Sequence, residues 1–381
     1  MSKKKILVMI DWFYPGYRAG GPVRSCFNVI ERLGHEFEFK VITRDTDYCE
    51  SVPYKGIIPN TWTTHPNGLI VHYLTESKLN SSGIESLIRN EDPDLLWING
   101  IYSKWFSIMP LRKWKGKTII SARGMLNPEA LKIKALKKRI FLTVARLTGM
   151  FDHVIFHATN NDEKNNIIKH FPNARIIIAP NFPVMESPFP KKKEKNVNML
   201  RLVNIARIAP EKNILYGLEL LKEFGNEIGA DQKIILDIFG TVYDPDYFEK
   251  CKEASDSLPA CISVNFKGGI DPKAVSEALS NYDMLFFPSR SENYGHTVVQ
   301  AMSCGLPVII SDATPWRGLE LRRCGWDINL PDKSKFIQVL KKSLLMDVTV
   351  YHELSIGAKA FAQQILNDPQ TLVLNQNLFR S

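Results

Sequence analysis

The residues best suited to sugar-phosphate chemistry lie in the polar loop Ser289–Gly295, where Glu292 precedes a helical segment from His296 to Cys304. A carboxylate accepts hydrogen bonds from sugar hydroxyls, and the free amides at the start of a helix attract anions. Both kinds of group at one loop suit a sugar phosphate. Spacing alone leaves open the alternative that Glu292 is a solvated loop residue or a helix cap.

Two buried strands are expected to position this loop. The apolar segments Asp283–Phe287 and Val308–Ile310 flank it, in the strand–loop–helix–strand order of a parallel α/β sheet. Ligands of such sheets bind at the carboxyl ends of the strands, and the Glu292 loop follows such an end.

Two further strand-to-helix turns carry cations or glycines that could face a ligand. Arg207 and Lys212 flank the turn after another apolar strand, although two such cations are also common as ordinary surface charge. Gly20 and Gly21 follow the first apolar strand, Lys5–Ile10, and allow a ligand to approach the backbone closely. A mere tight turn is the alternative reading of this glycine pair.

The segment SENYGHTVVQAM, followed by SCGLPVIISD, resembles the donor-site signature of the GT4 family of retaining glycosyltransferases. That signature has two glutamates with seven residues between them. The first corresponds to Glu292, and the second falls on Gln300, which lacks the charge to hold two ribose hydroxyls at once. The resemblance implies the α/β fold called GT-B: two Rossmann-like domains with parallel sheets that face a central cleft.

The same resemblance extends to other elements of the chain. It implies that Arg207 and Lys212 bind the donor diphosphate, and that Arg123 stands where the family commonly has a histidine beside the sugar. A structural ion pair is the alternative for Arg123. The implied catalytic residues are Glu292, Arg207 and Lys212, and the implied donor-binding residues are Gly20, Gly21, Arg123, Asn293, Tyr294, Gly295, His296, Thr297 and Gln300.

The composition of the chain excludes some classes of protein and some classes of binding partner. The chain has 381 residues, 44% hydrophobic residues and a net charge of +9. Its six cysteines are scattered without CxxC pairs, no apolar run is as long as a membrane span, and no signal peptide is evident, so a cytoplasmic protein is expected. The positive charge favours an anionic partner, and a nucleotide or a membrane surface is preferred to nucleic acid, for which charge is the sole argument.

The α/β pattern occurs twice along the chain. We therefore expect an acceptor domain over residues 1–185 and a nucleotide-sugar donor domain over residues 186–365, with residues 366–381 crossing back to the first domain. The proline- and lysine-rich segment Pro188–Lys195 is expected to be an exposed linker.

One segment of the chain is rich in basic residues, and its pattern is typical of a helix that binds a membrane surface. A single helix is expected from Pro128 to Leu147, with no acidic residue between Glu129 and Asp152. Its apolar residues recur at spacings of three and four, and six basic residues occupy the remainder. Such a helix can lie on anionic lipid, and a core helix with a solvated basic face is the alternative. The apolar residues are Ile133, Leu136, Ile140, Val144 and Leu147, and the basic ones are Lys132, Lys134, Lys137, Lys138, Arg139 and Arg146.

No metal and no cofactor are expected. Glycosyltransferases of the other major fold hold a divalent metal with an Asp-x-Asp triplet. Here two of the three triplets contain proline, and Arg207 and Lys212 are available to neutralise the leaving group instead. The triplets are Asp45-Thr46-Asp47, Asp92-Pro93-Asp94 and Asp244-Pro245-Asp246.

The resemblance thus implies a hexosyltransferase that uses a nucleotide diphosphosugar, such as a UDP- or GDP-sugar, with retention of configuration. A glycan or lipid-linked acceptor is expected, in the synthesis of a bacterial surface polysaccharide (O-antigen, capsule or exopolysaccharide). A nucleotide-sugar 2-epimerase of the same fold, or a catalytically weak sugar-nucleotide-binding protein, is the alternative.

Overall fold

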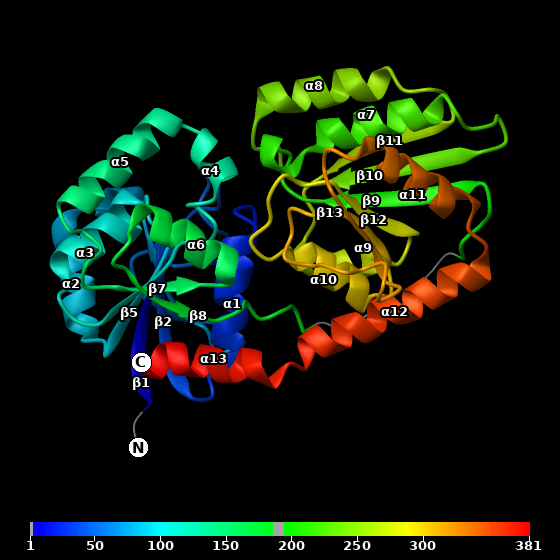
Figure 1. Ribbon diagram of the computed structural model, residues 1–381. Helices are drawn as coiled ribbons and strands as arrows, with labels where there is room; N and C mark the ends of the chain where they lie inside the picture. The colour runs from blue at the N-terminus through cyan, green and yellow to red at the C-terminus, as the bar shows by residue number, and fades with distance from the viewer. Residues whose placement is uncertain (1–2, 186–193) are drawn as a thin grey trace. The chain divides into compact units, whose positions relative to one another are not determined.

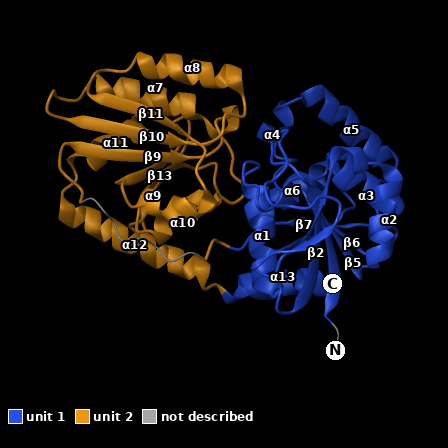
Figure 2. Cartoon of the chain, turned by 180° about the vertical axis from the view of Figure 1, so that it is seen from behind, with its two compact units in different colours: residues 1–182, 369–381 blue, residues 183–368 orange. Residues whose placement is uncertain are grey.

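The computed structural model describes residues 3–185 and 194–381. The chain divides into two compact units (Figure 2). The first unit comprises Met1–Phe182 together with Pro369–Ser381, and the second comprises Pro183–Asp368. The sequence placed these boundaries at residues 185 and 365. Each unit is an α/β structure with a parallel sheet, so the predicted fold class is confirmed.

The first unit contains an eight-stranded sheet of order β3-β4-β2-β1-β5-β6-β7-β8. Every pairing is parallel except that of β3 with β4. These strands form because most of them are short apolar segments that the sheet buries on both faces. The strands are β1 (Lys4–Ile10), β2 (Phe37–Arg44), β3 (Trp62–Thr64), β4 (Ile70–Leu74), β5 (Leu95–Asn99), β6 (Thr118–Ser121), β7 (Ile155–Ala158) and β8 (Arg175–Ile178).

Helices cover both faces of this sheet (Figure 1). Apolar residues of α1 and α13 pack on one face, and those of α2, α5 and α6 pack on the other. The helices are α1 (Gly21–Leu33), α2 (Ser81–Glu91), α3 (Met109–Lys113), α4 (Pro128–Lys132), α5 (Ala135–Leu147), α6 (Asn161–His170) and α13 (Pro369–Arg380).

The second unit contains a six-stranded parallel sheet of order β11-β10-β9-β12-β13-β14. Helices α7 and α11 pack on one face, and α9, α10 and α12 pack on the other. The strands are β9 (Met199–Ile205), β10 (Lys233–Phe239), β11 (Ile262–Gly268), β12 (Met284–Phe287), β13 (Val308–Ser311) and β14 (Gly325–Ile328). The helices are α7 (Ile214–Gly225), α8 (Pro245–Asp256), α9 (Val275–Leu279), α10 (His296–Ser303), α11 (Lys333–Leu345) and α12 (Val348–Leu366).

The predicted basic helix is wrong in its length, because two helices, α4 and α5, replace the single helix expected from Pro128 to Leu147. The chain leaves the helical path at Ile133–Lys134, where Lys134 has a left-handed backbone with φ of 54°. Lys138 Nζ donates to the Ala130 carbonyl at 2.5 Å, so one contact joins α4 to α5 across the break. The buried residues of α5 are Leu142 and Ala145. The predicted apolar stripe faces outward and is not part of the core.

The predicted linker falls mostly outside the described residues, which exclude 186–193. Lys195 is described and is not an exposed linker residue. It is buried, and its ammonium donates to the carbonyls of Asn196, Met199 and Leu344 at 2.5, 2.8 and 3.3 Å.

Candidate active site

The two loops predicted to bind the donor follow neighbouring strands of the second sheet. The chain runs from β9 outward through β10 to β11 and then returns to place β12 on the other side of β9. The order therefore reverses between β9 and β12, and ligands of open α/β sheets bind at such a switch point. Arg207 and Lys212 follow β9, and Glu292 follows β12.

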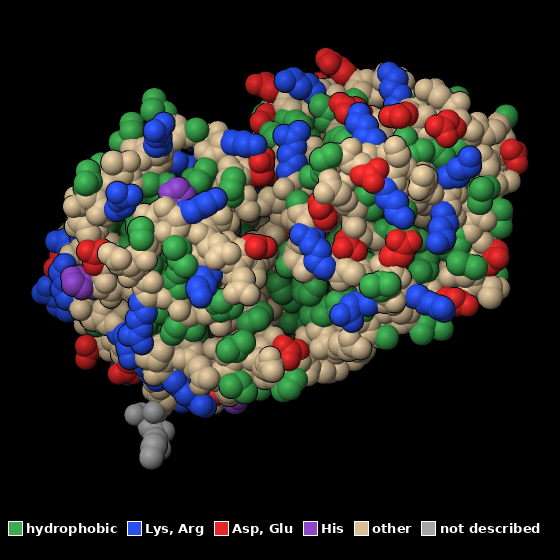
Figure 3. Space-filling view, viewed as in Figure 1, with side chains coloured by type: hydrophobic (Ala, Val, Ile, Leu, Met, Phe, Trp, Pro, Cys, Tyr) green, Lys and Arg blue, Asp and Glu red, His purple; other side chains and the backbone are tan. Residues whose placement is uncertain are grey.

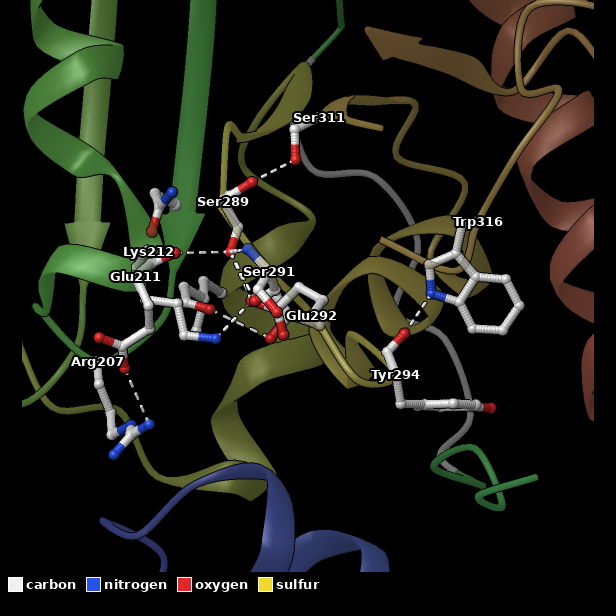
Figure 4. Close-up of polar contacts among 12 residues, drawn as sticks. Arg207, Glu211, Lys212, Ser289, Ser291, Glu292, Tyr294, Ser311 and Trp316 are labelled. Atoms are coloured by element: carbon white, nitrogen blue, oxygen red, sulfur yellow. Dashed lines mark hydrogen bonds and ion pairs between the residues drawn. The ribbon is translucent and has the colours of Figure 1, made fainter. Parts of the chain in front are cut away.

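The structure brings Lys212 and Glu292 together (Figure 4). Lys212 Nζ lies 2.5 Å from Glu292 Oε1, and the side chains are 15% and 10% exposed, respectively. Ser289 Oγ lies 3.0 Å from the same carboxylate oxygen. The Lys212 ammonium also lies 5.7 Å from the centre of the Phe287 ring at the end of β12. A lysine and a carboxylate from different strands thus form one partly buried ion pair.

Backbone contacts fix the two loops to each other. The Glu211 carbonyl accepts hydrogen bonds from Arg290 N at 2.9 Å and from Ser289 Oγ at 3.0 Å. Ser311 Oγ, at the end of β13, donates to the Ser289 carbonyl. Sequence reasoning missed Ser289, Ser311 and the carbonyl of Glu211. Serines immediately after two buried strands were the available signal for the first two.

Arg207 also pairs within the site. Its guanidinium lies 3.3 Å from Glu211 Oε1 and 5.0 Å from the centre of the Tyr243 ring. The other oxygen, Glu211 Oε2, is buried and accepts no hydrogen bond from the described part of the chain. Glu211 was not predicted, although it stands one residue before Lys212. Each proposed diphosphate-binding cation therefore has a carboxylate partner in the structure.

At the start of α10, the groups available to a ligand are backbone amides rather than side chains. Gly295 has φ of 77°, a left-handed conformation that favours glycine, and it opens the helix. The Trp316 indole donates to the Tyr294 carbonyl at 2.5 Å, and burial raises the pKa of the Tyr294 phenol. Thr297 Oγ1 donates to the Ile205 carbonyl at 3.2 Å. Since the first amides of a helix lack intrahelical partners, the helix start can supply donors to an anion.

The remaining predicted residues of this unit flank or extend that helix start. Asn293 lies in the loop between Glu292 and Tyr294, and His296 is the first residue of α10, with its ring centre 4.7 Å from that of Tyr294. Gln300 lies inside α10, is buried, and donates from Nε2 to Ser276 Oγ at 3.0 Å.

Gly20, Gly21 and Arg123 belong to the first unit. Gly20 has φ of 76° and stands at the N-cap of α1, while a Cβ at Gly21 would meet no atom within 4 Å. Gly21 therefore has open space beside its backbone at the end of the loop after β1, while the Gly20 amide donates to the Tyr17 carbonyl at 2.9 Å. Arg123 is buried near the end of β6, where its guanidinium donates to the Asn99 and Asn181 Oδ1 atoms at 2.7–3.0 Å. These amide partners differ from the ion pair that was the alternative reading.

One carboxylate of each Asp-x-Asp triplet has a structural partner. Asp47 accepts from the amides of Tyr17, Arg18 and Tyr48. Asp94 accepts from Lys5 N at 2.8 Å, and Asp244 caps α8 by accepting from Tyr247 N at 3.0 Å.

Two features are absent from residues 3–185 and 194–381. No three of their His, Cys, Asp and Glu side chains are grouped so that they could hold a metal ion. None of their helices combines the length and the apolar character needed to span a membrane.

A segment of the second unit is similar to a known protein family. Residues 186–319 match the model of the family described as glycosyl transferases group 1. A sulfoquinovosyl transferase from Arabidopsis thaliana is 30% identical over 112 residues, which are 29% of this chain. The matched segment spans 19% of the length of that relative.

Solved structures resemble the chain over nearly its whole length. Sucrose-phosphate synthase from Thermosynechococcus elongatus has a TM-score of 0.70 at 16% identity, covering 99% of this chain and 98% of that one. WaaG, a glycosyltransferase involved in lipopolysaccharide biosynthesis, has a TM-score of 0.69 at 14% identity, covering 97% and 98%. HepE from Anabaena in complex with UDP and glucose has a TM-score of 0.67 at 14% identity, covering 99% and 98%. The chain therefore has the GT-B fold, and residues 186–319 in its second unit are similar to the group 1 glycosyl transferases.

Proposed function

We propose that this protein transfers a hexosyl unit from a nucleotide diphosphosugar to a hydroxyl acceptor, with retention of configuration. The observation that carries the proposal is the meeting of Arg207, Lys212 and Glu292 at the switch point between β9 and β12. Breaking the glycosyl–phosphate bond leaves a diphosphate anion and an oxocarbenium-like sugar. Cations and helix amides aimed at the anion stabilise it as its charge develops.

Donor binding would exchange the partners of the two ion pairs. In the structure Lys212 is held by Glu292, and Arg207 by Glu211. A diphosphate competes for both cations, and its binding would release the Glu292 carboxylate to accept hydrogen bonds from the sugar hydroxyls. Glu292 would thus orient the sugar only when the diphosphate is in place.

The acceptor proton passes to an oxygen of the departing diphosphate in this proposal. The new bond joins the acceptor oxygen to the anomeric carbon on the face that the leaving group vacates. With Arg207 and Lys212 on the diphosphate, transfer needs neither a divalent metal nor a cofactor.

We also propose that the protein acts at the inner face of the plasma membrane, on a glycan or lipid-linked acceptor of a bacterial surface polysaccharide. The supporting feature is α5, where Leu136, Ile140, Val144 and Leu147 are 72%, 56%, 47% and 79% exposed. They follow one another at helical spacing and so form a single outward stripe. In Figure 3 green apolar and blue basic side chains lie next to one another over α4 and α5.

Charge complementarity selects an anionic lipid surface as the partner of this stripe. Lys137, Arg139 and Arg146 are exposed and flank it on the helix. An apolar face bordered by lysine and arginine is typical of helices that lie in the membrane interface. WaaG, which shares the fold, acts in lipopolysaccharide biosynthesis, and this agrees with a polysaccharide role.

A donor screen followed by product analysis tests the function. UDP- and GDP-sugars are first ranked by thermal shift, and transfer to glycoside acceptors is then followed by NMR in the presence of excess EDTA. We expect one donor to bind and to give a product with the anomeric configuration of the donor. Inverted product would overturn retention, and loss of activity that manganese or magnesium restores would overturn metal independence. Epimerised donor without acceptor would identify a 2-epimerase, and binding without turnover would identify a binding protein.

A further inference from the structure

The Ser289 hydroxyl lies near more acceptors than it can serve. Ser289 is the second residue after β12, and its side chain is fully buried. Its Oγ lies 3.0 Å from the Glu211 carbonyl, 3.1 Å from the Ser291 carbonyl and 3.0 Å from Glu292 Oε1 (Figure 4). A hydroxyl has one hydrogen to donate. The hydrogen therefore goes either to a neutral carbonyl or to the charged carboxylate.

The Glu292 carboxylate depends on this hydroxyl once its cation leaves. Its side chain is 10% exposed, so little water can solvate its charge. In the described part of the chain, the side-chain donors to this carboxylate are Lys212 and Ser289, and both contact Oε1. A buried charge that loses its partner is costly unless other donors remain. When a diphosphate takes Lys212, Ser289 is the donor that remains.

The Ser289 hydroxyl can change its acceptor without breaking the loop apart. The Glu211 carbonyl also accepts from Arg290 N at 2.9 Å, so it keeps a donor when Ser289 turns its hydrogen away. The Ser289 carbonyl accepts from Ser311 Oγ at the end of β13, and Ser311 is fully buried as well. The backbone of Ser289 is thus held in place while its hydroxyl is able to rotate.

We infer that Ser289 is the positioning residue for Glu292: its hydroxyl donates to the carboxylate when the diphosphate takes Lys212, and keeps the carboxylate oriented towards the sugar. Hydrogen bonds to a charged acceptor are the stronger ones, so the hydrogen moves to Glu292 once Lys212 no longer neutralises it. With Oε1 held by Ser289, Oε2 accepts from the sugar hydroxyls. This inference rests on the proposed function, which it deepens by naming the residue through which Glu292 survives the exchange of partners.

The test is a double-mutant cycle in the full-length protein. Ser289→Ala is made in the wild-type background and in Glu292→Gln, and the Kd of UDP or GDP is measured by calorimetry in all four proteins. Ser311→Ala is the matched control, because it removes a hydrogen bond from the same loop but none from Glu292. Thermal unfolding checks the fold of each variant, and kcat for sugar transfer is measured wherever Glu292 is intact.

We expect Ser289→Ala to raise the nucleotide Kd roughly tenfold in the wild-type background, because release of Lys212 then leaves a buried carboxylate without a donor. In Glu292→Gln the same change should alter Kd by about twofold or less, since a neutral amide carries no charge to stabilise. Such non-additivity is typical of residues that share one network. The kcat of Ser289→Ala should fall roughly tenfold to hundredfold. Ser311→Ala should have the same effect on Kd in both backgrounds.

Ser289→Thr tests whether the hydroxyl itself is what matters. It keeps the donor and should recover most of kcat and of nucleotide affinity. Ser289→Cys has a weaker donor of similar size, so it should show the same dependence on Glu292 with a smaller effect, and it replaces Ser289→Ala if that variant does not fold.

Two results would overturn the inference. One is an equal change of Kd on Ser289→Ala in both backgrounds, which would mean that Ser289 acts on the loop and not through Glu292. The other is a wild-type kcat in Ser289→Ala. A wild-type protein that binds neither nucleotide and transfers no sugar would instead overturn the proposed function, so the two failures are distinguishable.

Discussion

Lys212 and Glu292 neutralise each other in the structure, yet each is proposed to act on a different part of the donor. We predict that Arg207→Ala and Lys212→Ala each lower kcat/KM for the donor about a hundredfold. The loss corresponds to ~3 kcal/mol of transition-state stabilisation, typical for removal of one preorganised donor. Steady-state kinetics over a range of donor concentrations measures it.

Lys252→Ala is the matched control for these variants. Lys252 lies on α8 of the same unit and pairs with Glu249 at 2.8 Å, with both side chains exposed. An exposed ion pair of this kind contributes little, so its removal should leave both kinetics and folding unchanged. Wild-type kcat/KM in both site variants would disprove the diphosphate assignment.

Glu292→Gln separates the two roles of the carboxylate. We predict that transfer falls strongly because the sugar loses its orienting acceptor. Binding of UDP or GDP alone should become tighter, since Lys212 no longer has a carboxylate that competes with the diphosphate. Calorimetry with the nucleotide and a transfer assay give the two quantities, and weaker nucleotide binding in the variant would contradict the exchange of partners.

His157 in β7 is predicted to make the first unit sensitive to acid. Its ring donates from Nε2 to the Ala179 carbonyl at 2.8 Å and lies 2.7 Å from Ser121 Oγ through Nδ1. Burial, and secondly the charge of Arg123, lower the pKa of His157 from 6.5 to about 3. Because the unfolded chain binds the proton more tightly, stability falls as the pH drops from 6.5 towards 3, by at most roughly 5 kcal/mol.

His157→Gln removes this titration while keeping a donor for the Ala179 carbonyl. Thermal unfolding of both proteins between pH 7 and pH 4 should show a smaller loss of Tm in the variant. Asp and Glu carboxylates titrate in both proteins, so the difference between the two Tm curves reports the histidine alone. Parallel Tm curves would show that His157 is not held neutral.

The sequence reveals site residues that act through their side chains, but not those that act through backbone groups. Glu292, Arg207 and Lys212 were singled out because charged side chains after apolar strands are visible in the sequence and the family resemblance gives them roles, which stay predictions. The carbonyl of Glu211 joins the two loops through Ser289 and Arg290. A backbone acceptor has no sequence signal, so these contacts required the structure.

At the scale of elements, the expected strands Lys5–Ile10, Asp283–Phe287 and Val308–Ile310 match β1, β12 and β13 to within one residue at each end, because buried parallel strands appear as continuous apolar segments. β14 has a weak strand signal, since Gly325–Ile328 contains a glycine and an aspartate. Gly325 has φ of 142°, and a Cβ there would lie 2.0 Å from the Val308 carbonyl oxygen. The glycine that weakened the strand signal is what allows β14 to pair with β13.

The apolar stripe of α5 is predicted to bind anionic membranes. Replacing Leu136, Ile140, Val144 and Leu147 with Gln should abolish co-sedimentation with anionic vesicles at low salt. Replacing Lys137, Arg139 and Arg146 with Gln should weaken it and remove its salt dependence, at about 1 kcal/mol for each residue near the surface. Neutral vesicles should bind weakly throughout.

Ile356→Gln is the control for a general loss of surface hydrophobicity. Ile356 is 68% exposed on α12 of the second unit and has no predicted membrane role. Equal binding to anionic and neutral vesicles would contradict a membrane function of the stripe. Unchanged binding in the α5 variants would contradict it as well.

At the scale of the whole molecule, the chain passes from the first unit to the second and ends in the first. Helix α13 packs on the sheet of the first unit, although it follows the second unit in sequence (Figure 1). Asn375 Nδ2 donates to the Pro180 carbonyl at 2.8 Å, and Lys4 Nζ donates to the Phe379 carbonyl at 2.6 Å. The first unit is therefore completed by the last residues of the chain.

Phe379→Ala tests how much this return stabilises the first unit. Phe379 is fully buried, with ring centres 5.8, 5.6 and 5.0 Å from those of Phe37, Phe39 and Trp97. We predict that the substitution lowers the free energy of unfolding of the first unit by about 3–5 kcal/mol, because it removes buried area and leaves a cavity. Val373→Ala, on the same helix but 50% exposed, should change it by less than about 0.5 kcal/mol. Calorimetry should show the transition of the first unit shifted to lower temperature, while the transition that rises with bound UDP or GDP, assigned to the second unit, stays in place. A shift of both transitions by the same amount would show that the two units unfold as one and that α13 couples them.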